Sequence, residues 1–148
     1  ALAALIEDLV AANRILAGLN VLDGFGHVSV RHPDHADRYL LSRSVAPELV
    51  TRDDIMTFDL NSLAQDGDTR TPYLERFIHG EIYRQRPDVI AVVHSHAATV
   101  VPFAASSVPL KPICASPPNE SPVLSLALLC VGVKRTGRRR RWRLARNR

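Results

Sequence analysis

The chain has 148 residues, enough for one domain with a hydrophobic core but too few for two. Apolar residues make up 46% and charged residues 23%, a balance that excludes a fibrous chain and a chain disordered throughout. The net charge of +4 is segregated, because nine of the 19 Lys and Arg residues, and no acidic residue, lie in residues 134–148. Ten basic residues remain against 15 acidic ones in residues 1–133, which leaves that part at −5.

Cysteine usage and the N-terminal sequence indicate a compartment. Cys114 and Cys130 lie late in the chain at a spacing unlike that of metal sites, and such a pair gives no reason to infer a disulfide framework. The first ten residues include Glu7 and Asp8 and form no basic leader, and no apolar run approaches the ~20 residues that span a bilayer. We therefore expect a cytoplasmic protein with no membrane partner.

The first third of the chain predicts a helix followed by a β-hairpin. Apolar residues recur at a spacing near 3.6 through residues 2–19, which is typical of an amphipathic helix. Glycines and an aspartate at 23–26 indicate a turn. His27–Arg31 then alternates apolar and polar residues, and Arg38–Ser42 is a second strand-like run after a polar turn. The two runs predict a hairpin.

The middle of the chain predicts two further strands and a second long helix. Residues 47–51 resemble a short helical turn, and residues 54–59 resemble a strand. Pro72 is expected to open a helix over residues 73–86, with another proline just after its end. Residues 89–93 are almost continuously apolar, which is typical of a strand buried on both faces.

Beyond the last predicted strand the sequence changes character. Residues 97–105 could begin another helix, and the elements up to that point predict a mixed α/β architecture. Four prolines lie in residues 112–122, an apolar run follows at 123–133, and an arginine-rich block comes last. We place one domain at residues 1–112 and expect residues 113–148 to be a divergent tail, Pro-rich and then Arg-rich, that is disordered.

Two histidines at the end of the predicted valine-rich strand form the most informative pattern. Side chains two positions apart on a strand point to the same face, so His94 and His96 are expected to emerge together. Neutral imidazole is a zinc ligand, and catalytic zinc sites combine three protein ligands with an open position. The alternative is a pair of surface histidines without a ligand.

Other polar residues nearby leave several readings open. Glu75 is expected in the first turn of the second helix, where the helix dipole favours a carboxylate, and that placement alone explains an acidic residue there. His79 lies one turn further along the same face of the helix. Three roles are open to it, namely metal ligand, hydrogen-bond partner of a ligand, or structural residue, and we favour the structural role. His32 and His35 flank a proline in a turn and are expected to be solvated.

Four separated blocks of sequence resemble the class II aldolase and adducin family in order and spacing. They are Gly26–Arg31 (GHVSVR), Pro72-x-x-Glu75, residues 82–88 (IYRQRPD) and residues 91–96 (AVVHSH). The resemblance covers roughly residues 5–112. It implies a three-layer α/β/α fold with a central mixed, largely antiparallel sheet, of which the C-terminal part is incomplete in this sequence.

The resemblance also implies a metal site and a reaction type. In that family the histidines matching His94 and His96 bind a divalent metal, usually zinc, with Mn, Co or Mg as alternatives, and the glutamate matching Glu75 is a metal neighbour and an acid/base group. A divalent cation stabilises the enediolate that forms when a C–C bond breaks. We expect a metal-dependent lyase that catalyses aldol cleavage or decarboxylation, with Glu75 moving the proton.

Two departures from the sugar-phosphate aldolases of the family bear on the substrate. Those enzymes have Asn in place of His27 and a Ser-Ser pair, at Tyr73 and Leu74 here, which helps to hold the substrate phosphate. Tyr and Leu supply no comparable pair of hydroxyl donors. The sequence therefore resembles more closely the branch that includes decarboxylases of hydroxylated aromatic acids. We expect a small, non-phosphorylated hydroxy or carboxy substrate bound through five residues: His27, Ser29, Ser42, Ser44 and Tyr73.

The likeness ends after Cys114, and the continuation resembles a truncated or frame-shifted end. Family members supply a third metal histidine from later strands and a C-terminal segment that completes a neighbouring subunit's site. We therefore expect weak or no metal binding and reduced or absent activity. The homotetramer typical of the family is not favoured with this C-terminus. Two other functions remain open: an adducin-like assembly domain, and a nucleic-acid binder acting through residues 138–148. Trp142 is the one aromatic residue within that basic tail, which disfavours the second.

Overall fold

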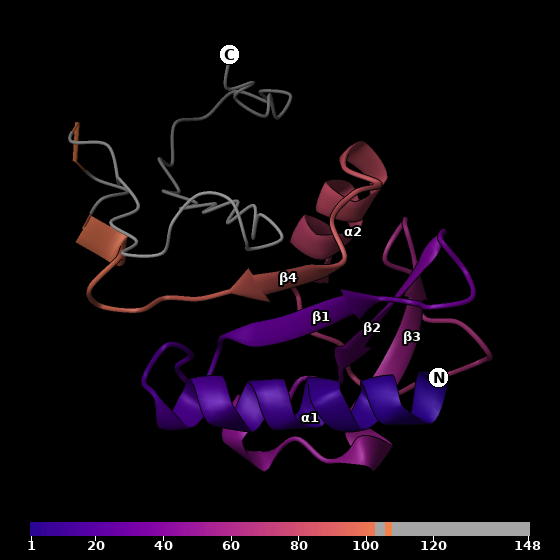
Figure 1. Ribbon diagram of the computed structural model, residues 1–148, viewed down its shortest axis with the longest axis horizontal. Helices are drawn as coiled ribbons and strands as arrows, with labels where there is room; N and C mark the ends of the chain where they lie inside the picture. Colours follow the sequence, from indigo (N-terminus) through magenta and orange to yellow (C-terminus); the bar gives the residue numbers. More distant parts are fainter. Residues whose placement is uncertain (103–105, 108–148) are drawn as a thin grey trace, which may run out of the picture.

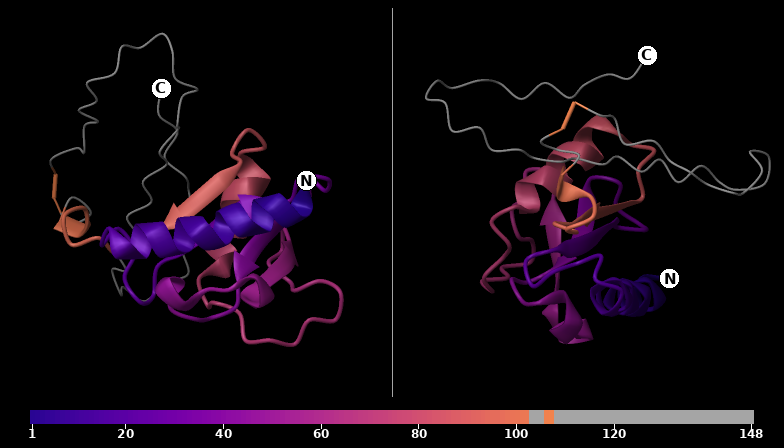
Figure 2. Two further views of the ribbon diagram at one scale, coloured as in Figure 1. Left: turned by 60° about the horizontal axis from the view of Figure 1, so that its bottom comes forward. Right: turned by 90° about the vertical axis from the view of Figure 1, so that its left-hand side faces the viewer.

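Two helices cover opposite faces of a four-stranded sheet in the computed structural model, which describes residues 1–102 and 106–107 (Figures 1 and 2). The elements in chain order are α1 (Leu2–Gly18), β1 (His27–Arg31), β2 (Arg38–Ser42), η1 (Pro47–Leu49), η2 (Arg52–Asp54), β3 (Ile55–Asp59), α2 (Arg76–Gln85) and β4 (Ala91–His94). The strands follow the order β3-β2-β1-β4, and every neighbouring pair is antiparallel. The predicted three-layer α/β/α arrangement is confirmed.

Strand pairing confirms the predicted hairpin and adds one long-range contact. Ser29 lies opposite Leu41 in the β1–β2 pair, as a hairpin requires. On its other side β1 pairs with β4, and in this pair His27 lies opposite His94. The first and last strands of the described chain are therefore neighbours, and this contact brings distant histidines to one end of the sheet.

Alternation along the strands divides the core into two layers. Val28, Val30 and Leu40 point toward α1 and pack with Leu9 and Leu22. The intervening positions face α2, where the larger cluster is composed of eight buried side chains: Tyr39, Leu41, Met56, Phe58, Tyr73, Ile82, Tyr83 and Val92. His27, Ser29 and Arg31 alternate along β1 and therefore point to one face of the sheet. The guanidinium of Arg31 contacts Tyr83 of α2, so this is the face that α2 covers.

A buried asparagine joins α1 to the start of β1. The side-chain amide nitrogen of Asn13 donates to the carbonyl of Leu9 at 2.9 Å, and its oxygen accepts from the backbone N–H of Val28 at 3.3 Å. Asn13 is fully buried, so these bonds replace the water that its amide would otherwise need. The contact fixes the backbone immediately after His27.

The second helix begins later than the sequence predicted. Pro72 forms an isolated bridge with Arg43, and the backbone N–H of Ser44 donates to the carbonyl of Thr71 at 2.8 Å. This pairing keeps the chain extended at Pro72, so α2 starts at Arg76 rather than at residue 73. Glu75 is consequently the residue that caps the helix, with φ −86° and ψ 3°, and not a first-turn residue.

The last strand differs from the prediction in its burial. Within the described residues β4 is an edge strand with β1 as its neighbour, and it alternates between exposed and buried positions. Val93 is 42% exposed while Val92 and His94 are buried, so burial on both faces was wrong. Of the helix expected at 97–105, residues 101–102 are helical and 103–105 lie outside the described residues, as does the predicted tail at 113–148. In the described part, no helix combines the length and the apolar character that crossing a membrane requires.

Substitution of Gly80 is predicted to destabilise the fold. A Cβ atom at this position of α2 would collide with the Ser62 hydroxyl and lie 2.9 Å from the carbonyl oxygen of Leu60. We expect Gly80→Ala to lower the free energy of unfolding by about 1–3 kcal/mol in urea denaturation, because backbone atoms must move apart. Gly18→Ala is the matched control, since no atom lies within 4 Å of its Cβ position, and alanine there should be neutral or mildly stabilising. Equal stability of the two variants would contradict the close approach.

Candidate active site

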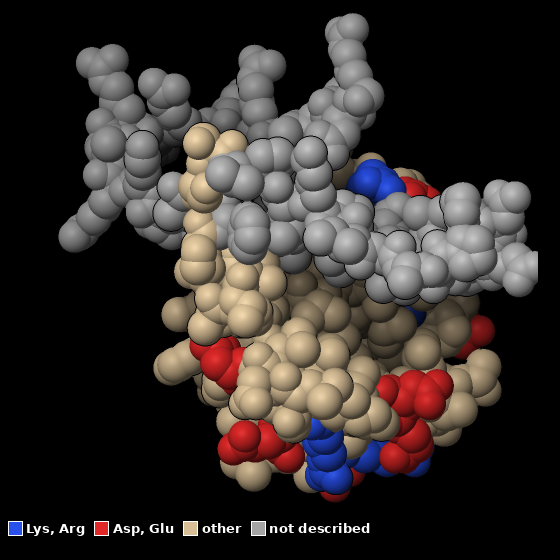
Figure 3. Space-filling view, turned by 60° about the vertical axis from the view of Figure 1, so that its left-hand side comes forward, with Lys and Arg blue, Asp and Glu red and all other residues tan. Residues whose placement is uncertain are grey.

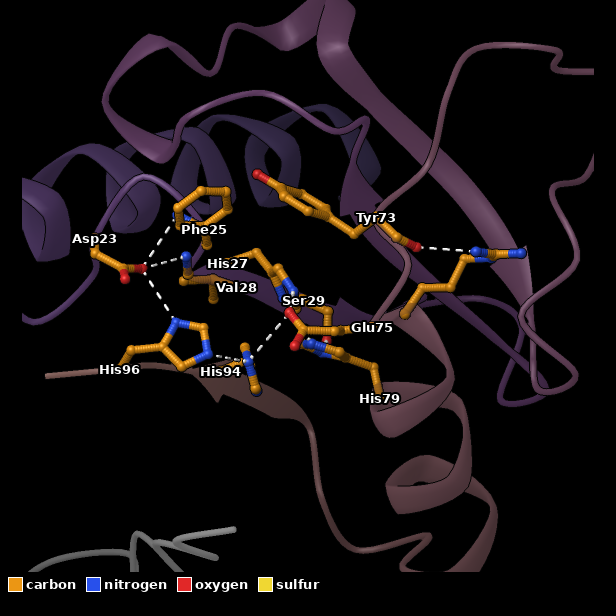
Figure 4. Close-up of polar contacts among 12 residues, drawn as sticks. Asp23, Phe25, His27, Val28, Ser29, Tyr73, Glu75, His79, His94 and His96 are labelled. Atoms are coloured by element: carbon orange, nitrogen blue, oxygen red, sulfur yellow. Dashed lines mark hydrogen bonds and ion pairs between the residues drawn. The ribbon is translucent and has the colours of Figure 1, made fainter. Parts of the chain in front are cut away.

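Three polar side chains converge where β1 begins and β4 ends (Figure 4). Directly opposed residues of an antiparallel pair project to the same face, so the register places the rings of His27 and His94 together, with centroids 4.9 Å apart. The cap position of α2 brings in Glu75, whose Oε2 lies 3.3 Å from His94 Nε2 and 3.7 Å from His27 Nε2. These three ligand atoms lie within 4.8 Å of one another.

His96 approaches the same cluster from just beyond the end of β4. Its Nε2 lies 3.1 Å from Nε2 of His94, and its Nδ1 lies 3.3 Å from Oδ1 of Asp23. Oδ1 of Asp23 also accepts from the backbone N–H groups of Phe25 and Gly26, so one carboxylate orders the turn and orients the imidazole (Figure 4). The sequence predicted a turn at Asp23 but not this contact, because the two residues are 73 positions apart.

The arrangement of donor atoms fits a divalent cation. Two ligands of a tetrahedral zinc ion at ~2.0–2.1 Å lie about 3.3 Å apart. The separations of His94 Nε2 from His96 Nε2 and from Glu75 Oε2, 3.1 and 3.3 Å, are of this size. Imidazole and carboxylate are also the ligand types of catalytic zinc sites. The buried Nε2 atom of His27 has no hydrogen-bond partner among the described residues, and at 3.7 Å from Glu75 Oε2 it lies further away than a second zinc ligand would.

Burial favours the neutral form of three imidazoles, those of His27, His79 and His94. Removal from water lowers the pKa of His27 to about 3, with the nearby His94 and His96 adding to the effect. It also lowers the pKa of His94, where Glu75 opposes the shift, and it holds the pKa of His79 well below its ordinary value. Neutral imidazole is the form that binds metals, so the lowered pKa of His94 favours its binding form.

A pocket of about 530 Å³ opens beside these groups. Its lining consists of Gly24, Phe25, Ser44, Val45, Ala46, Tyr73, Leu74, Glu75 and His96, a set that contains no Lys or Arg. Two large apolar side chains at its edge reach into solvent, Phe25 with 74% and Leu74 with 87% of its surface exposed. On the face shown in Figure 3, charged side chains of both signs gather toward the lower part, and most of the described surface above them is uncharged.

The five predicted substrate-binding residues are divided between the pocket and the core. Tyr73 and Ser44 line the pocket, and the hydroxyl of Tyr73 donates to the carbonyl of Val45. His27 lies behind Tyr73, with ring centroids 4.3 Å apart, and is fully buried. Ser29 and Ser42 are fully buried and are not among the lining residues. The substrate contacts of all five stay predictions.

Ser29 belongs instead to a buried polar chain behind His27. Its hydroxyl lies 2.6 Å from His79 Nδ1 and 2.7 Å from the hydroxyl of Tyr83. The other ring nitrogen of His79, Nε2, lies 2.8 Å from His27 Nδ1. His79 is fully buried, in agreement with the structural role that we favoured for it, and its contacts lead directly to the site.

Comparisons with known proteins identify the family. Residues 7–123 match the model of the class II aldolase and adducin N-terminal domain. The chain is 39% identical over 110 residues to decarboxylase tropJ of Talaromyces stipitatus, covering 72% of this chain and 41% of that protein. It is 33% identical over 117 residues to 3,4-dihydroxyphthalate decarboxylase of Arthrobacter keyseri, covering 72% and 46%.

A solved structure of an aldolase shares the fold. L-fuculose 1-phosphate aldolase from Glaciozyma antarctica superimposes with a TM-score of 0.65 at 29% identity, covering 74% of this chain and 46% of that one. The chain thus spans less than half the length of these relatives. Because the family model matches most of the sequence and the superposition confirms the class II aldolase-like fold, this chain belongs to the class II aldolase and adducin N-terminal domain family.

Proposed function

We propose that this chain supplies the metal-binding part of a lyase site that breaks a C–C bond, preferably by decarboxylation of a small hydroxylated aromatic acid. The observation that carries the proposal is that His94 Nε2 lies 3.1 Å from Nε2 of His96 and 3.3 Å from Oε2 of Glu75, beside a pocket whose lining contains no Lys or Arg. Two relatives support this proposal by their names: one is a decarboxylase and the other is a 3,4-dihydroxyphthalate decarboxylase.

The residues of the cluster have separate tasks in such a reaction. His94 and His96 would hold the cation, with Glu75 beside it. Bound there, a divalent cation supplies Lewis-acid stabilisation of the negative charge that develops on substrate oxygens. When the bond to the carboxylate breaks, CO₂ leaves and the electron pair of that bond stays on the substrate carbon, which must then receive a proton. Glu75 is 44% exposed at the pocket wall, so its carboxyl group reaches solvent for reprotonation and reaches the substrate for delivery.

The pocket lining favours an aromatic ring over a sugar phosphate. Phosphate recognition relies on charge-assisted bonds from Arg, Lys or clustered donors, and the lining offers no cationic side chain. Phe25, Tyr73 and Leu74 instead present apolar surface, against which a flat ring buries its faces. The substrate class is therefore a carboxylated, hydroxylated aryl compound without phosphate.

Loss of either proposed histidine ligand is predicted to weaken metal binding. We expect the full chain to bind one Zn²⁺ weakly in calorimetric titration, because the ligands proposed among the described residues are two imidazoles and one carboxylate. His94→Ala and His96→Ala should each lower the affinity at least about tenfold, or roughly 1.4 kcal/mol. His35→Ala, in an exposed turn, is the matched control and should bind as the parent chain does. Equal affinities for all three variants would refute the assignment.

Removal of an apolar side chain at the pocket edge is predicted to weaken the binding of aryl substrates. Leu74→Ala should lower the affinity for 3,4-dihydroxyphthalate about two- to fivefold, or roughly 0.5–1 kcal/mol, because the ring loses apolar contact. Leu63→Ala removes a similarly exposed leucine, 57% accessible, that is absent from the lining. This control should leave the affinity unchanged. Preferential binding of L-fuculose 1-phosphate over the aryl acid, measured by calorimetry with Zn²⁺ present, would contradict the proposed substrate class.

A further inference from the structure

Four buried side chains form a continuous hydrogen-bonded chain that ends at the candidate site. In order they are Tyr83, Ser29, His79 and His27, and the three contacts between them measure 2.7, 2.6 and 2.8 Å. Tyr83 and His79 come from α2, while Ser29 and His27 come from the facing side of β1. Each neutral member has a single polar hydrogen to donate, so the direction of one bond determines the others.

The shortest contact sets that direction. Bonds donated by an N–H group to oxygen span 2.7–3.2 Å, whereas hydroxyl donors reach 2.5–3.0 Å. At 2.6 Å, the contact between Ser29 and His79 Nδ1 is shorter than the N–H range, and on this ground we assign the serine hydroxyl as donor and the ring nitrogen as acceptor. Because the hydrogen of Ser29 is used there, the 2.7 Å contact with Tyr83 must be donated by the phenol.

The remaining hydrogens follow in sequence. His79 is neutral and accepts at Nδ1, so its hydrogen is on Nε2, from which it donates to Nδ1 of His27. An imidazole that accepts at Nδ1 carries its hydrogen on Nε2, so the hydrogen of His27 lies on Nε2. That nitrogen is the buried one without a hydrogen-bond partner among the described residues, 3.7 Å from Glu75 Oε2.

We propose that Tyr83, Ser29 and His79 are positioning residues that hold His27 as its Nε2–H tautomer, so that His27 donates a hydrogen bond to an anionic oxygen of the ligand and does not bind the cation. A nitrogen that carries a hydrogen has no lone pair in the ring plane to offer a metal. Although His27 belongs to the compact His27–Glu75–His94 group, its longer 3.7 Å separation from the carboxylate agrees with a place beside the cation. The substrate class follows from the proposed function: a carboxylate or phenolate oxygen would satisfy the buried N–H group.

Nitrogen-15 NMR of the imidazole rings in the full chain tests the tautomer directly. We expect His27 Nε2 to resonate as a hydrogen-bearing nitrogen and Nδ1 as an acceptor, and to keep this pattern when Zn²⁺ is added. His94 and His96 should change on the same addition. A bare Nε2 on His27 in the metal-free chain, or loss of its hydrogen on titration with Zn²⁺, would overturn the proposal.

Two variants separate positioning from general packing. Ser29→Ala removes the donor to His79 Nδ1 and should convert His27 from one tautomer into a mixture. Tyr39→Phe is the matched control, because it deletes another buried hydroxyl whose ring stacks on His79 at 6.4 Å but whose bonds go to Ser62 and Arg76. The control should leave the His27 resonances in place. If Ser29→Ala fails to fold, the spectrum of the parent chain still decides the question.

Benzoate is the probe for the anionic-oxygen part of the inference. Its addition with Zn²⁺ present should move the His27 Nε2 proton downfield, and His27→Phe should lower benzoate affinity at least threefold while changing Zn²⁺ affinity less than twofold. An unmoved proton at saturating benzoate, or a tenfold loss of Zn²⁺ affinity in His27→Phe, would refute it. Because the tautomer is read without metal, an Nε2–H signal in a chain that binds no Zn²⁺ would support the positioning chain and count against the proposed lyase site.

Discussion

The pairing of β1 with β4 is the constraint on which the site depends. These strands are separated by about 60 residues, and their register sets His27 against His94. If β4 slipped by one residue, His94 would turn to the opposite face and Val93 or Ser95 would lie opposite His27. Pairing in the observed register therefore does two things at once. It completes the sheet in the described chain, and it creates the polar end into which Glu75 and His96 reach.

Local patterns in the sequence account for much of the fold, and they account for less of the site. Helical periodicity predicted α1 and strand alternation predicted the hairpin, because both depend on neighbours in sequence. The bridge between Arg43 and Pro72, which delays α2, joins segments 29 residues apart, so no local signal could reveal it. The same limit explains the strand at residues 91–94: its apolar run indicated a strand, but not that one face would be exposed within the described residues.

For the site, the sequence predicted the partners that spacing and family resemblance could link. The i, i+2 spacing brought His94 and His96 into one hypothesis, and their ring nitrogens do lie close together. The position of His27 at the same cluster depends on sheet register, and that of Asp23 depends on how the preceding turn folds back. Ser29 was expected to contact substrate, yet strand alternation turns it toward α2 and His79. The roles of all these residues rest on the proposed reaction.

The contact of Asn13 with Val28 has a consequence for how the molecule loosens. The side chain of Asn13 accepts a hydrogen bond from the backbone N–H of Val28 and donates one to the carbonyl of Leu9 within α1. The first helix therefore holds the beginning of β1 in place. If α1 detaches, the backbone at that point loses a buried acceptor while the β2–β3 pairing keeps its own bonds. Detachment of α1 would therefore disturb the end of β1 that carries His27 and leave the β2–β3 pairing in place.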